Sequence, residues 1–146
     1  MNSVSDVESI CYKPAVELAE MIRKKEISPV ETIKIFFKRI EEVNPKVNAY
    51  CTLTMESALQ EAGRAEQMVM DGEELGLLHG VPFSIKDLIY TKSVRTMQGS
   101  KIYEDFVPEE DAPLVERLKA AGGIMLGKTT TPEFGHKAVT DSKVTG

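Results

Sequence analysis

The chain has 146 residues, of which 42% are hydrophobic and 28% charged, the proportions of an ordinary globular protein with room for one domain. Its net charge of −5 argues against a general affinity for phosphate backbones, so no direct nucleic-acid partner is expected. No apolar run reaches transmembrane length and the N-terminus lacks a signal-peptide pattern, which argues against a membrane partner or secretion. The two cysteines, Cys11 and Cys51, fit free thiols in a reducing cytoplasm, where we expect the protein to reside.

The first half of the chain has the periodicity of helices. Residues 14–26 open with Pro14, a residue suited to a first helical position, and carry one apolar face. A second helix is expected to begin at the capping box Ser28–Glu31, in which the hydroxyl of Ser28 satisfies a free backbone N–H. We expect this helix to end at Asn44-Pro45, because the residue before a proline is pushed out of helical conformation.

A short strand and a third helix are predicted next. Residues 47–53 are rich in β-prone side chains and predict a strand or an extended stretch. Thr54 is a candidate cap for a helix over residues 55–70, whose apolar positions recur at helical spacing. Asp71-Gly72 is expected to close that helix.

The second half changes to shorter elements. Val81–Ile85 predicts a buried strand, and the small and polar residues 91–100 predict a loop. Another helix is expected to start at Asp111-Ala112-Pro113 and to stop at Gly122-Gly123 in left-handed conformation. Ile124–Leu126 then predicts a second buried strand.

A phosphate-binding loop is the first functional hypothesis, because residues 122–129 (GGIMLGKT) fit the pattern G-x-x-x-x-G-K-[ST]. Such a loop requires a strand before the glycines and a helix after the lysine. Here a helix is expected before Gly122, and no amphipathic run follows Thr129. We therefore expect a buried strand followed by an ordinary Gly-Lys turn, with Lys128 in a structural role.

Lys86 is the better candidate for chemistry, because it ends an apolar strand beside a loop that carries glycine and threonine. Burial there would disfavour the charged ammonium and lower the pKa of Lys86, which would make the amine a base able to activate a serine hydroxyl. The alternative is an exposed lysine with no such role, or a lysine paired with the neighbouring acid Asp87.

The segment around Lys86, Gly80–Asp87 (GVPFSIKD), resembles the lysine block of the amidase signature family. The N-terminal segments Ser28–Glu31 and Asn44–Tyr50 also resemble the opening of that family. The resemblance extends over about residues 14–140, and Thr130, where the family usually has asparagine, is the one departure. Further blocks agree in order and spacing: Thr96–Ser100, Asp111–Gly123, and Gly127–Thr129 with Glu133–Gly135.

This resemblance implies both a fold and a mechanism. It implies an α/β fold in which N-terminal helices (residues 14–71) lead into part of a mixed-sheet core (residues 76–146), so that residues 1–146 form the N-terminal part of a single amidase domain. Members of the family hydrolyse small-molecule amides, or move ammonia from one, with two serines and a lysine and with no cofactor. By this resemblance Lys86 is the base, acting through a bridging serine while the second serine attacks the carbonyl. The residues that would bind the substrate are not identifiable.

The two serines of that mechanism are not found in the sequence, which ends at Gly146 before any segment rich in glycine and serine. Ser84 lies two residues before Lys86 and on the same face of the strand, but it is not the family's nucleophile. We therefore expect a truncated or isolated part of an amidase, without amidase activity alone. The alternative is a non-catalytic module that pairs with a partner, and a homodimer is one such pairing. The remaining candidate serines, Ser100 and Ser142, are expected in loops.

Metal chemistry is not expected from this sequence. His79 and His136 are the only histidines, and neither has a second His or Cys at ligand spacing. The acidic residues 104–105 and 109–111 lack the alternating ligands and central glycine of a calcium loop, and they predict a solvated loop and a helix N-terminus.

Overall fold

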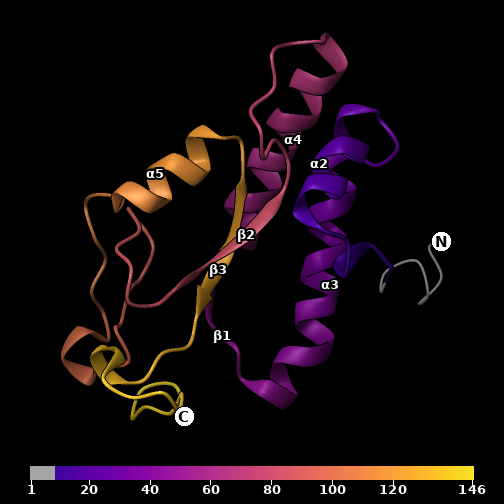
Figure 1. Cartoon of the computed structure of the whole chain (residues 1–146). Helices are drawn as coiled ribbons and strands as arrows, with labels where there is room; N and C mark the ends of the chain where they lie inside the picture. The colour runs from indigo at the N-terminus through magenta and orange to yellow at the C-terminus, as the bar shows by residue number, and fades with distance from the viewer. Residues whose placement is uncertain (1–8) are drawn as a thin grey trace.

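The computed structural model describes residues 9–146, and its centre is a three-stranded sheet in the order β1–β3–β2 (Figure 1). β1 (Tyr50–Leu53) runs antiparallel to the central strand β3 (Ile124–Thr129), and β2 (Pro82–Lys86) runs parallel to it. The predicted α/β fold with a mixed sheet is therefore confirmed. The helices are α2 (Ala15–Arg23), α3 (Pro29–Val47), α4 (Met55–Asp71) and α5 (Pro113–Ala120), with two short 3-10 helices, η1 (Lys101–Tyr103) and η2 (Glu133–Gly135).

The sheet lies between two layers of helix. On one face, Ile124 and Leu126 of β3 pack into a core formed with α3 and α4, and α2 packs in turn on α3 (Figure 1). On the other face, Met125 packs with Ile85 of β2 and Val115 of α5. Successive side chains of a strand point to opposite faces, so the alternation along β3 divides the core in two.

The N-terminal cap of α3 is confirmed, whereas the bounds predicted for α2 are wrong. The Ser28 hydroxyl accepts a hydrogen bond from the Glu31 N–H at 3.0 Å. Pro14 is the residue before the first turn of α2 rather than its first helical residue. The helix ends at Arg23 because Lys25 adopts a positive φ of 61°, which turns the chain toward Ser28.

The prediction that α3 ends at Asn44-Pro45 is also wrong, since the helix continues to Val47. Pro45 lies in the last turn, where its missing N–H removes only one helical hydrogen bond. The side chain of Asn44 instead fastens the next strand, accepting from the Tyr50 N–H at 2.8 Å and donating to the Tyr50 carbonyl at 3.2 Å. Asn48, in left-handed conformation with φ 48°, ends the helix.

The strand prediction for residues 47–53 is confirmed only from Tyr50 onward. Thr54 precedes α4 as predicted, but its hydroxyl does not cap that helix. It donates to the Met125 carbonyl at 2.8 Å and so joins the start of α4 to the central strand. Gly72 closes α4 in left-handed conformation as expected, with φ 71°.

The second half follows the predicted order of elements, with one strand longer than expected. Residues 91–100 form a loop, and Gly122 follows α5 with the predicted positive φ of 88°. The residue before α5 is Ala112, and the Asp111 carboxylate accepts instead from the Lys92 N–H at 2.7 Å. The Gly-Lys turn is wrong, because Gly127 and Lys128 lie inside β3.

No helix within residues 9–146 is long and apolar enough to cross a membrane.

Candidate functional site

Lys86 is the last residue of β2, and its side chain is exposed. The adjacent Ile85 is only 2% exposed and packs toward α5, so Lys86 and Ser84 both lie on the opposite face. Their Cα atoms are about 6.6 Å apart, the two-residue repeat of a strand. Of the two environments that the sequence left open for Lys86, the structure shows the exposed one.

A hydroxyl pair lies on the same face as Lys86. The Tyr50 phenol on β1 and the Ser84 hydroxyl on β2 are 2.5 Å apart, and either group can be the donor. Since β3 lies between these strands, the tyrosine side chain reaches across the central strand to make this contact. Ser84, Tyr50 and Lys86 thus place two hydroxyls and one amine on an open part of the sheet.

The turn that follows Lys86 is held in place by Asp87. Its backbone N–H donates to the Thr129 carbonyl at 2.9 Å, and its carbonyl accepts from the Gln98 N–H at 3.0 Å. Its carboxylate, in a residue only 1% exposed, accepts from the Met97 N–H at 3.0 Å. The alternative in which Asp87 pairs with Lys86 is not observed, since no ion pair of Lys86 occurs within residues 9–146.

The desolvated lysine of this region is Lys128. Its side chain is fully buried, and it pairs in register with Ile85 on the face toward α5. The ammonium donates to the carbonyl of Ile89, to the hydroxyl of Thr96 at 2.9 Å and to that of Thr91 at 3.1 Å. Burial lowers the pKa of Lys128 to about 8, an effect that the negative charge of Asp87 partly opposes. The expected structural role of Lys128 agrees with these contacts.

Two acidic groups near Lys128 respond to burial in the opposite direction. Burial raises the pKa of the Asp87 carboxyl, while the charge of Lys128 and the Met97 N–H partly oppose the shift. The second carboxylate oxygen of Asp87 is buried without a hydrogen-bond partner among the described residues. Burial, followed by the charge of Asp87, raises the pKa of the Cys51 thiol to about 11, so this free thiol stays protonated.

The loop formed by residues 96–100 packs on the segment after β3. The Phe134 N–H donates to the Gln98 carbonyl at 2.9 Å, and the Ser100 hydroxyl donates to the Glu133 carboxylate at 2.6 Å. Gly99 has a positive φ of 66°, and a Cβ there would lie 2.6 Å from the Thr131 carbonyl oxygen. Sequence blocks that lie far apart along the chain therefore meet around Asp87.

β3 requires a glycine at position 127, beside the buried Lys128. The φ of Gly127 is +153°, and a Cβ at this position would lie 2.2 Å from the carbonyl oxygen of Thr52 on β1. The register with both neighbouring strands shifts close to this residue. The glycine and the lysine that suggested a phosphate loop thus form an irregular strand, and only the 3-10 helix η2 follows, so the phosphate-loop hypothesis fails.

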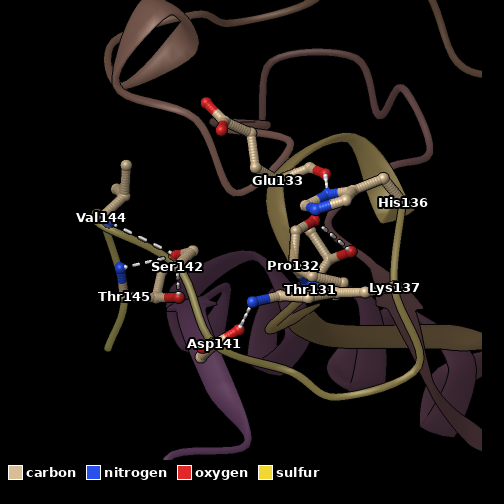
Figure 2. Close-up of polar contacts among 9 residues, drawn as sticks. All are labelled: Thr131, Pro132, Glu133, His136, Lys137, Asp141, Ser142, Val144 and Thr145. Atoms are coloured by element: carbon tan, nitrogen blue, oxygen red, sulfur yellow. Dashed lines mark hydrogen bonds and ion pairs between the residues drawn. The ribbon is translucent and has the colours of Figure 1, made fainter.

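The other candidate serine and histidines have local structural contacts. Ser142 forms a tight turn in which its hydroxyl accepts from the N–H groups of Val144 and Thr145 (Figure 2). His79 is buried, with Nε2 2.9 Å from the Ala65 carbonyl, and His136 lies against the Glu133 carbonyl (Figure 2). Within residues 9–146 no group of three His, Cys, Asp or Glu side chains could hold a metal ion.

Sequence reasoning selected Lys86 as the candidate base but missed two features of its surroundings. Tyr50 carried no signal, because its contact with Ser84 depends on the pairing of β1 with β3. Burial of Lys128 did have a signal, since the residue closely follows the apolar run Ile124–Leu126. A strand that continues through Gly127 would have placed this lysine in the core.

Three comparisons relate the chain to proteins of known type. A glutamyl-tRNA(Gln) amidotransferase subunit from Carboxydothermus hydrogenoformans is 44% identical over 131 residues, which cover 90% of this chain and 27% of the relative. The peptide amidase of Stenotrophomonas maltophilia superposes with a TM-score of 0.79 at 31% identity, over 84% of this chain and 26% of that enzyme. A fatty acid amide hydrolase superposes with a TM-score of 0.91 over 99% of this chain and 26% of its own, at 24% identity, which shows the fold alone.

The amidase family profile matches residues 31–146, which is most of the chain. The chain spans about a quarter of the length of the curated relatives that it matches, for example 27% of the Carboxydothermus protein. Fold, sequence blocks and family profile agree, and the chain belongs to the amidase signature family.

Proposed function

We propose that this chain supplies the base, Lys86, of an enzyme that breaks the C–N bond of a small-molecule amide. The observation that carries the proposal is the position of Lys86 within a family match that runs from residue 31 to residue 146. Lys86 ends a strand whose following turn is held by Asp87, and its side chain faces an open surface. A rigid strand end is a suitable support for a catalytic group, because catalysis requires precise placement.

The proposed mechanism follows the lysine and two serines that the family resemblance implies. The neutral amine of Lys86 takes a proton through a bridging serine, and the oxygen of the second serine bonds to the amide carbon. The C–N bond then breaks, the nitrogen leaves with a proton returned from the lysine, and water releases the acyl group as a carboxylic acid. In this proposal both serines come from outside these 146 residues.

Hydrolysis and amidotransfer are two outcomes of the same bond cleavage. In amidotransfer the released ammonia passes to a second acceptor, and the Carboxydothermus relative carries the name of an amidotransferase subunit. The peptide amidase of Stenotrophomonas maltophilia represents the hydrolytic outcome. Identity is higher to the amidotransferase relative, 44% against 31%, and we favour ammonia release from a small amide as the shared first step.

A hybrid enzyme tests this proposal directly. Residues 31–146 would replace the matching segment of the Carboxydothermus relative, and ammonia release from glutamine and from simple aliphatic amides would be measured. We expect an active hybrid whose activity is lost in the Lys86→Met variant. A hybrid that folds, by circular dichroism and thermal melting, but releases no ammonia would contradict the proposal.

The 146-residue chain alone is the matching control. We expect it to release no ammonia, because a base without its nucleophile retains little of the rate enhancement. Ammonia release by the pure chain that disappears in Lys86→Ala would show that a complete site exists within it. The alternative function, a non-catalytic module, predicts a hybrid whose activity does not depend on Lys86. A partner or a second copy of the chain would then be detected by its mass in solution.

A further inference from the structure

We propose that Lys128 and Asp87 are positioning residues for Lys86, forming a buried brace that holds both ends of residues 87–98 onto the central strand. This inference rests on the proposed function for its catalytic meaning, but the brace itself is tested without catalysis. Lys128 and Asp87 touch neither the substrate nor the Lys86 side chain in this proposal. They act by fixing the backbone at the point where the chain leaves the sheet, directly after Lys86.

The first half of the brace is the ammonium of Lys128. Its three N–H donors match three acceptors, the Ile89 carbonyl and the hydroxyls of Thr91 and Thr96. Hydrogen bonds from a charged donor in a buried site are stronger than neutral ones. The loop that starts just after Lys86 is thereby fastened to β3 at a fully buried point.

The second half of the brace is Asp87. Its backbone N–H and carbonyl join the Thr129 carbonyl and the Gln98 N–H, while its carboxylate holds the Met97 N–H. Residue 87 and residues 97–98 are therefore tied to each other and to the end of β3. The Lys86 carbonyl accepts from the Ile89 N–H at 3.0 Å, so the intervening turn closes on the residue that Lys128 holds.

Charge makes the two halves interdependent. Lys128 and Asp87 are 0% and 1% exposed, and each is the largest charge acting on the other. Loss of either one leaves the other as an uncompensated buried charge, which is strongly unfavourable. The sheet face that buries this pair lies opposite Lys86, so the brace can fix the strand end without occupying the site.

The test is an NMR comparison of the 146-residue chain with its Lys128→Met variant, which keeps an unbranched apolar side chain and removes its donors. In the parent chain the amides of residues 86–89 should have order parameters near the rigid value of about 0.85. In Lys128→Met they should fall to about 0.6 or lower, while Ile124–Leu126 stay rigid. The amides of residues 89–96 should also titrate near pH 8 in the parent, because the pKa of Lys128 is about 8, and this step should vanish in the variant.

Two control variants separate positioning from general loss of stability. Lys92→Met removes a charge from the same loop at an exposed side chain, and it should leave the order parameters of residues 86–89 unchanged. Leu18→Ala weakens the distant core around α2 and should lower the denaturation midpoint without loosening Lys86. If Lys128→Met does not fold, Thr96→Val removes one of the three acceptors and should give a smaller fall in the same amides.

The proposal is overturned if Lys128→Met folds with residues 86–89 as rigid as in the parent, or if Leu18→Ala loosens them equally. A braced Lys86 in a hybrid that releases no ammonia would contradict the proposed function and leave the brace intact. An active hybrid with a mobile turn at residues 86–89 would overturn the brace and leave the proposed function intact.

Discussion

The two faces of the sheet differ in how far they bury a lysine side chain. On one face Lys86 is exposed beside the Ser84–Tyr50 hydroxyl pair, and nothing in the described residues forms an ion pair with it. On the other face Lys128 is fully buried and holds three oxygen acceptors. The two residues belong to neighbouring parallel strands, at adjoining register positions.

This difference shows that local sequence does not decide which of the two lysine side chains is buried and desolvated. Both lysines follow short apolar runs, so both would be expected in a low-dielectric environment. Register and the irregularity at Gly127 decide that Lys128 points toward α5 and that Lys86 points away. The end of β2 thus exposes Lys86 on one face, and the contacts of Lys128 on the opposite face support that strand end.

The strongest test of the contrast is the substitution Lys86→Met in the hybrid enzyme. General-base catalysis contributes roughly 10²–10⁴-fold, so we expect ammonia release to fall by about that factor. The free energy of unfolding of the 146-residue chain should change by no more than about 0.5 kcal/mol, because the replaced side chain is exposed. Initial rates and urea denaturation measure the two quantities. A loss of stability together with a loss of rate would mean that Lys86 has a structural role.

Lys128→Met should have the reverse profile in the 146-residue chain. Removing the Lys128 ammonium leaves three buried acceptors without their donor and the buried Asp87 carboxylate without its largest favourable charge, so the urea midpoint should fall markedly. The double variant Lys128→Met with Asp87→Asn should recover part of that loss, because no charge remains buried. Equal losses in the single and double variants would show that hydrogen bonds to the loop, rather than charge, dominate the effect.

The sequence predicted those features that depend on neighbours along the chain. The Ser28 cap, the closing Gly72 and the left-handed Gly122 depend on side chains within a few residues, and all three are confirmed. The order of helices and strands also followed from periodicity. Family blocks identified the relationship because their spacing reflects how the elements pack.

The failed predictions involve partners that are distant in sequence. Thr54 lost its capping role to the Met125 carbonyl, 71 residues away. Asn44 holds the backbone of Tyr50 on the next strand while the helix runs on past Pro45. Lys128 lies inside a buried strand rather than in the expected turn, because pairing with β1 and β2 extends β3 through Gly127. Such contacts appear only once the sheet is assembled.

Raising the pH should stabilise the parent chain between about pH 8 and 9. Unfolded Lys128 keeps its proton up to its ordinary pKa of 10.5, whereas in the folded chain its pKa is lowered to about 8. Between these values the unfolded state binds more protons, so stability rises with pH, by about 1 kcal/mol over one unit. Urea midpoints at pH 8 and 9 measure the rise, and Lys128→Met should abolish it.

The Cys51 thiol opposes that rise in stability, so removing the thiol should make the rise larger. The folded thiol has a pKa of about 11 against an ordinary value of 9.0. Between these two values the folded state binds more protons than the unfolded state. The thiol therefore lowers the stability of the chain as the pH rises through this range. Cys51→Ala should therefore extend the stabilisation beyond about pH 9. A parent chain whose stability falls between pH 8 and 9 would contradict the assignment of a buried Lys128 with a pKa of about 8.

The smallest effect is expected on the open face, at the Tyr50–Ser84 hydrogen bond. A typical hydrogen bond contributes about 0.5–1.5 kcal/mol, and exposure of Ser84 places this one at the lower end. Tyr50→Phe and Ser84→Ala should each lower the free energy of unfolding slightly, and the double variant should cost no more than the larger single loss. Strictly additive losses in that cycle would mean that the hydroxyls do not interact in solution. Coupling between them would instead establish that β1 and β2 are joined across β3 beside Lys86, on the face that the buried brace leaves free.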